Sequence, residues 1–273
     1  MRVSILIIII SLLGCNKSSV VTNNVLVYGH AGLGFDVLNS QYPINSMAAI
    51  EHAFNFYNLD GVEVDIQFTK DGAVFLYHDQ FLETSTNCAG EIYNLNRSAI
   101  VNCRYRKQFQ NANSPFLIEL DSLLNRFQKN WPKKKISLNV QDRFASNTDL
   151  RKLAELLISK IKSYGLENNC NIECSNIDFV SAAKTEGSEI KSYLVERLNN
   201  RVIELIIKRD LDGIVTSHTD SDSVLQEKLS LNGKDVVLYG HLIQKDYTTS
   251  SYNGVVALQV DNALQALKYL NRD

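Results

Sequence analysis

Several features are scarce in this chain of 273 residues, and each scarcity excludes a class of protein. The formal net charge is only −2, so there is no basic field of the kind that attracts nucleic acid, and we expect no nucleic-acid partner. Prolines number only three, and no low-complexity tract, internal repeat or interdomain linker is evident. No Cys-x-x-Cys or Cys/His spacing suits a structural zinc site. What remains is an ordinary composition, 45% hydrophobic, in a chain long enough for one large α/β domain.

Long apolar runs are also scarce, and the one that stands out lies at the N-terminus, from Val3 to Leu13. It is shorter than the roughly 20 residues that span a bilayer, but it is typical of a signal peptide. The run ends on Leu12-Leu13-Gly14-Cys15, which resembles a bacterial lipoprotein signal. We therefore expect residues 1–14 to be removed, Cys15 to be acylated and residues 15–24 to form a tether. The protein would then be an exported lipoprotein anchored in a membrane of the cell envelope. The alternative is an ordinary secretory signal with an incidental cysteine.

Export would place the four remaining cysteines, Cys88, Cys103, Cys170 and Cys174, in an oxidising compartment. An even set of this kind permits disulfides, with three possible connectivities. The simplest connectivity is local, and it predicts the bonds Cys88–Cys103 and Cys170–Cys174.

Short β-branched segments alternate with amphipathic ones along the chain. Helical spacing is found at residues 46–57, 150–164, 196–209, 224–231 and 263–270. Strands are predicted at residues 25–28, 61–68, 73–77, 135–140, 171–174, 192–195, 213–216, 236–239 and 255–260. Alternating strands and helices indicate a parallel sheet with helical crossovers. We therefore predict that residues 25–273 form a single irregular (β/α)8 TIM barrel, present as a monomer.

Nine strands are one too many for such a barrel. The turn Thr69-Lys70-Asp71-Gly72 is too short for a helical crossover, so the strands on either side of it should form a hairpin. Residues 84–130, rich in Asn, Cys and Arg, are predicted to be an insertion after that hairpin.

Two acids interrupt the apolar strand 61–68. On a strand, residues i and i+2 face the same way, so Glu63 and Asp65 project together while Val62 and Val64 face the other side. Two adjacent carboxylates repel unless a cation joins them or one is protonated. Hard oxygen ligands suit Ca²⁺ or Mg²⁺. An exposed polar strand face would be the purely structural alternative, but in a barrel this face leads to the active-site end.

Histidines stand at the ends of predicted strands. His30 ends the first and His78 the third, and their ordinary pKa near neutrality suits acid–base work. His218 and His241 follow later strands and are weaker candidates. His52 lies within the first predicted helix, where a structural role is expected.

Together these segments resemble the glycerophosphodiester phosphodiesterase family. The resemblance covers residues 25–95 and rests on Gly29-His30-Ala31-Gly32, Pro43-Ile44-Asn45-Ser46, Glu63-Val64-Asp65, Thr69-Lys70-Asp71-Gly72 and His78-Asp79. It implies a phosphodiesterase TIM barrel of the phospholipase-C-like type. It also implies hydrolysis of a small phosphodiester, either a glycerophosphodiester or a related phospholipid head group. His30 and His78 would act as acid and base, and Glu63 and Asp65 would bind Ca²⁺ or Mg²⁺.

The chain departs from the family pattern at several site positions. Ala31 stands in place of an arginine and Ile44 in place of a glutamate. In the strand 135–140 and just after it, Asn139 replaces a ligand glutamate and Gln141 a phosphate-binding lysine. We expect Asn139 to serve as an uncharged third metal ligand, and Asn45 and Gln141 to bind substrate. Lost charge-assisted contacts should weaken phosphate binding.

Two other functions are weighed against hydrolysis. The chain could be a catalytically weak relative that binds a ligand or polysaccharide at the cell surface, which the four replaced positions favour. A glycosidase with paired carboxylates fits poorly, because residues i and i+2 of one strand cannot readily flank a sugar bond from opposite sides.

Overall fold

The computed structural model describes residues 25–35, 42–106, 115–145, 148–241, 243–249, 252–270 and 272. The predicted signal peptide (1–14), the acylated Cys15 and the tether lie outside these residues. Nowhere in the described part of the chain is a helix both long and apolar enough to cross a membrane.

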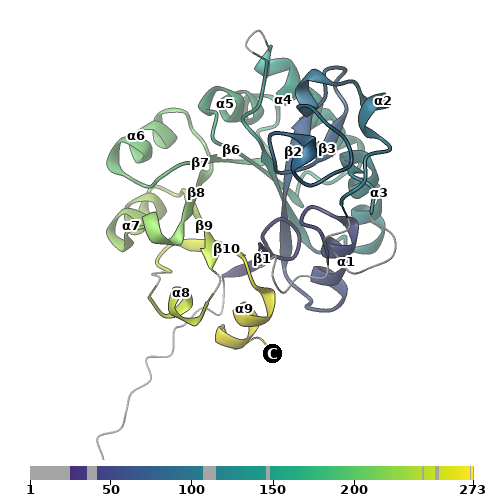
Figure 1. Ribbon diagram of the computed structural model, residues 1–273. Coiled ribbons are helices and arrows are strands. Elements are labelled where there is room, and N and C mark those ends of the chain that lie inside the picture. Colours follow the sequence, from purple (N-terminus) through teal and green to yellow (C-terminus); the bar gives the residue numbers. More distant parts are fainter. Residues whose placement is uncertain are drawn as a thin grey trace, which may run out of the picture.

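The described residues form a closed barrel of eight parallel strands, which confirms the predicted fold class (Figure 1). Closure is achieved because β1 pairs with both β2 and β10, and every pair around the ring is parallel. The barrel strands are β1 (Leu26–Gly29), β2 (Gly61–Phe68), β5 (Lys135–Val140), β6 (Cys170–Cys174), β7 (Lys191–Val195), β8 (Gly213–Ser217), β9 (Asp235–His241) and β10 (Val255–Val260).

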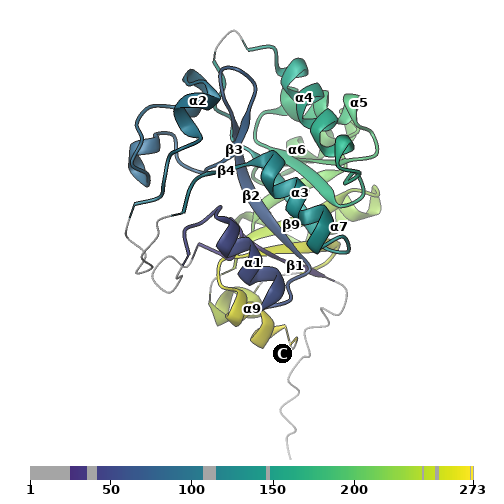
Figure 2. The same cartoon turned by 90° about the vertical axis from the view of Figure 1, so that its right-hand side faces the viewer.

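The surplus predicted strand is β3 (Val74–Leu76), which lies outside the barrel. It pairs antiparallel with the carboxyl-terminal residues of β2, as the short turn predicted. The strand β4 (Ile118–Glu119) then pairs antiparallel with β3. Within the turn, the Thr69 hydroxyl donates to Asp71 at 2.6 Å, and Gly72 adopts a φ of +84°. Figure 2 shows β3 and β4 beside the upper part of β2. The hairpin therefore carries the residues after β3 to the carboxyl end of the barrel.

Helices surround the barrel in Figure 1. They are α1 (Met47–Asn55), α3 (Leu120–Asn130), α4 (Leu150–Ser163), α5 (Ile177–Glu186), α6 (Asn200–Lys208), α7 (Ser223–Leu231), α8 (Gln244–Thr249) and α9 (Ala263–Tyr269). The five helical segments predicted from the sequence are all present. Ser46 caps α1 by accepting a hydrogen bond from the Ala49 N–H at 3.2 Å. The main core lies between these helices and the outer faces of the strands.

The stretch predicted as an insertion, 84–130, contains two different structures. Its first part, with η2 (Ile92–Asn94) and α2 (Arg97–Ile100), encloses a small core of its own beside the hairpin, together with η1 (Leu82–Thr84), which comes just before it. Its last part is α3, whose Leu120, Leu123, Leu124 and Phe127 pack into the main core as one of the barrel helices.

One predicted disulfide is confirmed and the other is wrong. Cys88 and Cys103 are bonded, with their Cα atoms 5.6 Å apart, and they close the small core beside the hairpin. Cys170 and Cys174 are both free and buried. They lie on the same strand, β6, and face the helix layer. Four residues of strand extend about 13 Å, well beyond the roughly 4.4–6.8 Å that a disulfide spans between Cα atoms.

Candidate active site at the carboxyl end of the barrel strands

The two faces of β2 divide as the alternation predicted. Val62, Val64, Ile66 and Phe68 pack outward into the main core. Glu63 and Asp65 therefore point into the barrel, where both are buried.

A pocket of about 330 Å³ opens at the carboxyl end of the barrel strands. It brings together four of the predicted site residues, which come from β1, β2, β5 and the segment after β3. The residues lining it are His30, Phe35, Asp65, His78, Asn139, Glu173, Val195, Val215, Tyr239, Gly240, Gln259 and Asp261. No lysine or arginine is among these described lining residues. The predicted convergence of His30 and His78 at one end of the barrel is thus confirmed.

Glu63 lies at the base of this region and is fully buried. Its Oε2 accepts a hydrogen bond of 2.7 Å from the Ala31 N–H and lies 3.8 Å from His30 Nε2. Its Oε1 is buried and has no hydrogen-bond partner in the described part of the structure. Burial, together with the charges of Asp65 and Glu173, raises the pKa of Glu63 well above its usual range.

The turn after β1 is shaped to reach Glu63. Ala31 adopts a φ of +49°, in the left-handed region that costs a residue with a Cβ roughly 1–2 kcal/mol. The Gly32 N–H donates to the Glu63 carbonyl at 2.8 Å. Ala31 thus contributes a backbone N–H to the acid.

Asp65 is held by side-chain amides. Asn45 Nδ2 donates to its Oδ2 at 2.8 Å, and Gln141 Nε2 and Asn139 Nδ2 donate to its Oδ1 at 2.6 and 3.2 Å. Asn45 Oδ1 also accepts from the Asp65 N–H at 2.9 Å. Asn45 and Gln141, predicted to bind substrate, therefore orient Asp65, and neither lines the pocket. Their contact with substrate stays a prediction.

Glu173 is an acid of the site that sequence reasoning missed. It lies on β6, is 1% exposed and lines the pocket. Gln259 Nε2 donates to both of its carboxyl oxygens at 3.0 Å. Burial raises the pKa of Glu173 to about 8. One signal could have found it: in Asn171-Ile172-Glu173-Cys174 the acid alternates with apolar residues, as Glu63 and Asp65 do on β2.

Each candidate catalytic histidine is paired with a carboxylate. His30 Nδ1 lies 2.6 Å from Oδ1 of Asp261, a residue that sequence reasoning missed although it directly follows the last strand. His78 Nδ1 lies 3.1 Å from Asp79 Oδ1, and this hydrogen bond raises the pKa of His78. In both rings Nδ1 is occupied, so Nε2 is the atom available for proton transfer.

Phe35 stands between the two imidazoles. Its ring centroid lies 4.5 Å from that of His30 and 5.4 Å from that of His78. The loop carrying His78 is fixed to β2, because Gln67 Nε2 donates to the carbonyls of Tyr77 and Asp79, each at 2.9 Å. Arg143 donates to the His78 carbonyl. Both imidazoles thus contact one aromatic ring, each in an edge arrangement.

The weaker histidine candidates lie elsewhere. His218 and His241 contact each other with ring centroids 4.6 Å apart, and neither lines the pocket. Burial lowers the pKa of His241 to about 3, so this side chain stays neutral. His52 stacks on Phe56 at the end of α1.

The donor set suits a hard cation. Glu63 and Asp65 are buried acids, Glu63 Oε1 has a free lone pair, and Asn139 can present an amide oxygen. Among the described residues, no group of three His, Cys, Asp or Glu side chains is arranged to hold a metal ion. As these side chains are arranged, a cation at Glu63 and Asp65 would therefore need further ligands, from neutral oxygens or from a side chain that moves towards it.

Comparisons with known proteins agree with this architecture. The model of the glycerophosphoryl diester phosphodiesterase family matches residues 38–195, more than half of the chain. A glycerophosphodiester phosphodiesterase of Caldanaerobacter subterraneus subsp. tengcongensis is 28% identical over 156 residues, which are 55% of this chain and 58% of that protein. The chain matches less than two thirds of the length of this and the other curated relatives.

Solved structures show the same fold. A glycerophosphodiester phosphodiesterase from Parabacteroides distasonis superposes with a TM-score of 0.77 at 16% identity, over 91% of this chain and 97% of that one. An Oleispira antarctica phosphodiesterase, solved in complex with the product sn-glycerol-3-phosphate, superposes with a TM-score of 0.72 at 16% identity, over 90% and 96%. At this identity the superpositions establish the fold, while the family model reaches β1–β2 loop residues, β2 and the strands up to β7. The chain belongs to the glycerophosphoryl diester phosphodiesterase family.

Proposed function

We propose that this protein hydrolyses glycerophosphodiesters, or related phospholipid head groups, with the help of Ca²⁺ or Mg²⁺. The observation that carries the proposal is the pair of histidine–carboxylate couples, His30–Asp261 and His78–Asp79, on two sides of one acidic pocket. Membership of the family supports the reaction class. The Oleispira antarctica phosphodiesterase was solved with its product, sn-glycerol-3-phosphate. This supports a glycerol phosphate as one of the two products of the reaction proposed here.

The cation would be held by Glu63, Asp65 and Asn139. When bound, it would neutralise and polarise the phosphodiester. This role is needed because the described residues lining the pocket include several acids and neither lysine nor arginine to receive an anion.

The histidines would move the protons. His30, oriented through Nδ1 by Asp261, would take the proton of the glycerol 2-hydroxyl at Nε2 as that oxygen attacks phosphorus. His78, whose pKa is raised, would give a proton to the departing alcohol as its bond to phosphorus breaks. The cyclic phosphate formed in this step would then be opened by water, with the two proton transfers reversed.

The test is an assay of the purified protein on glycerophosphodiesters, with Ca²⁺, with Mg²⁺ and with a chelator. We expect His30→Ala and His78→Ala each to lower kcat by about 10²–10⁴-fold, the usual contribution of general acid–base catalysis. His52→Ala, which removes a histidine outside the site, is the matched control and should retain activity. Hydrolysis that survives both site substitutions would overturn the proposal.

A second function deserves a direct test because four family positions are replaced, at Ala31, Ile44, Asn139 and Gln141. Without charged contacts to phosphate, the pocket could bind a surface ligand and not turn it over. Binding of glycerophosphodiesters detected by calorimetry without hydrolysis in any metal condition would favour this second function.

We also propose that the protein is an exported lipoprotein monomer, anchored through an acyl chain on Cys15. The support is the sequence pattern of residues 1–15. In cells, Cys15→Ser should block processing or release the protein from membranes. Unchanged processing and membrane retention would contradict acylation at that residue.

A further inference from the structure

A second acid lies in the same row of the barrel interior as Asp65. In the register of the barrel, Asp65 on β2 lies opposite Asn139 on β5, and Asn139 lies opposite Glu173 on β6. Register partners on parallel strands project to the same side, so these three side chains form one row facing the interior. All three line the same pocket. Two acids, Asp65 and Glu173, therefore flank the amide of Asn139 in one row of the pocket.

Glu173 has only neutral partners in the described structure. Its two oxygens accept from Gln259 Nε2, and no lysine or arginine of the described chain lies within ion-pair distance of it. Burying a carboxylate without a cation costs several kcal/mol, so a cation that reached Glu173 would stabilise its ionised form.

A second observation, on the interior face of β2, points to a cation. Glu63 is completely buried on the interior face of β2, and its Oε1 has no hydrogen-bond partner in the described part of the chain. An orphaned, buried carboxylate oxygen is a lone pair available to a metal ion. The charges of Asp65 and Glu173 both act on Glu63, so the three acids share one electrostatic environment.

We propose that Glu173 supplies a third carboxylate to the cation site, beside Glu63 and Asp65. This inference rests on the proposed function, because it takes the divalent cation from there. In the present arrangement no three described acids surround one point. Glu173 must therefore leave Gln259 and swing towards Asp65 when the ion binds, and Gln259 holds it in readiness when the site is empty.

Calorimetry with Ca²⁺ and with Mg²⁺ tests this on the whole protein and four variants: Glu173→Gln, Asn139→Glu, the double variant Asn139→Glu/Glu173→Gln, and Glu167→Gln. Glu167 is the matched control, because it lines a pocket at the opposite end of the barrel. We expect Glu173→Gln to weaken cation binding at least tenfold. The double variant, which moves the acid back to β5, should restore the affinity to within a few-fold of the original. Glu167→Gln should leave it unchanged.

Thermal unfolding provides a readout independent of turnover. A ligand that binds only the folded state raises the unfolding temperature, and at a given ligand concentration the rise is larger when the ligand binds more tightly. The cation-induced rise should shrink in Glu173→Gln and return in the double variant. If Glu173 were only structural, Glu173→Gln would change the unfolding temperature without cation and leave the cation-induced rise intact.

The outcomes separate the two proposals. If the original protein binds the cation and Glu173→Gln binds it equally well, the role of Glu173 is overturned while the proposed function stands. If the original protein binds neither cation and hydrolysis does not depend on one, the cation itself is wrong, and the role of Glu173 fails with it.

Discussion

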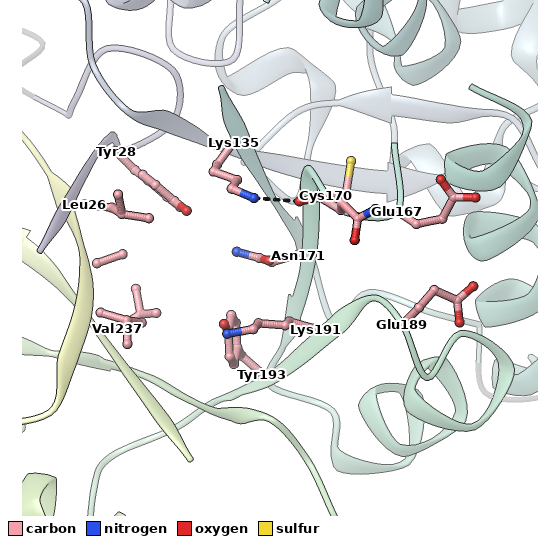
Figure 3. A pocket seen from close by; sticks show the side chains of 13 residues that line it. Leu26, Tyr28, Lys135, Glu167, Cys170, Asn171, Glu189, Lys191, Tyr193 and Val237 are labelled. Carbon is pink, nitrogen blue, oxygen red and sulfur yellow. Dashed lines mark hydrogen bonds between the residues drawn. The ribbon is translucent and has the colours of Figure 1, made fainter. Parts of the chain in front are cut away.

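The carboxylates at the two ends of the barrel have different partners. At the amino end, Asp60, Asp212 and Asp235 stand just before or at the start of β2, β8 and β9, and each has a cation. Arg272 Nη1 lies 2.5 Å from Asp60, Lys184 Nζ 2.8 Å from Asp212, and Lys191 Nζ 2.5 Å from Asp235. This end has a pocket of about 310 Å³ too, and Figure 3 shows Lys135, Asn171 and Lys191 reaching into it from β5, β6 and β7.

At the carboxyl end, Glu63, Asp65 and Glu173 are more deeply buried, yet their described hydrogen-bond partners are backbone and side-chain amides. Paired, partly exposed charges at one end suit stability, whereas buried acids without a protein cation suit the binding of an ion. The contrast therefore separates an end of paired charges from the end that holds the candidate site, called here the functional end.

The largest effect should come from removing an acid of the functional end. Glu63→Gln keeps the size of the side chain and an oxygen that can accept from the Ala31 N–H, but it removes the charge. We expect kcat to fall by about 10²–10³-fold, the scale for one electrostatic group at a reacting centre. Because burial and the neighbouring acids already raise the pKa of Glu63 well above its usual range, the exchange removes little charge from the cation-free protein, which should unfold at about the same temperature. A large loss of stability would show that Glu63 is structural.

At the amino end the same kind of change should have the reverse result. Asp235 accepts from the buried Tyr193 hydroxyl at 2.8 Å as well as from Lys191. Asp235→Ala would leave that hydroxyl without its acceptor, which costs about 1–3 kcal/mol. Chemical denaturation should show a lower free energy of unfolding, while kcat on a glycerophosphodiester stays unchanged. A variant of normal stability and reduced kcat would break the division between the two ends.

Much of this arrangement could be predicted from the sequence because it follows local rules. The alternation along residues 61–68 placed Glu63 and Asp65 inside the barrel, and the short turn at Thr69–Gly72 placed the next strand in a hairpin. The disulfide between Cys170 and Cys174 was predicted only because four cysteines remained and local pairing was the simplest connectivity. The rise along a strand, applied to the strand predicted there, would have excluded it.

The contacts between strands could not be predicted. Asn45 and Gln141 were predicted to bind substrate. Their side-chain amides instead donate to Asp65, which is 20 and 76 residues away in sequence, and no local pattern reveals such distant contacts. Glu173 was missed for a related reason. A single acid on a short strand does not indicate a site. Only the strand register, which places Glu173 beside Asn139, shows that it belongs to the pocket.

The smallest expected effect is a shift of pH dependence at the functional end. The hydrogen bond to Asp79 raises the pKa of His78, and the bond in turn lowers the pKa of Asp79. If His78 gives its proton to the leaving alcohol, kcat/KM must fall as the pH rises through the pKa of His78. Asp79→Asn removes the negative charge that favours the imidazolium, so the alkaline limb of the profile should move to lower pH. The measurement is kcat/KM against pH for both proteins. Asp71→Asn, which changes an exposed aspartate in the hairpin turn, is the matched control and should leave the limb in place. A limb that stays where it was in Asp79→Asn would mean that the group titrating there is not His78, and the proton donor would have to be sought elsewhere in the pocket.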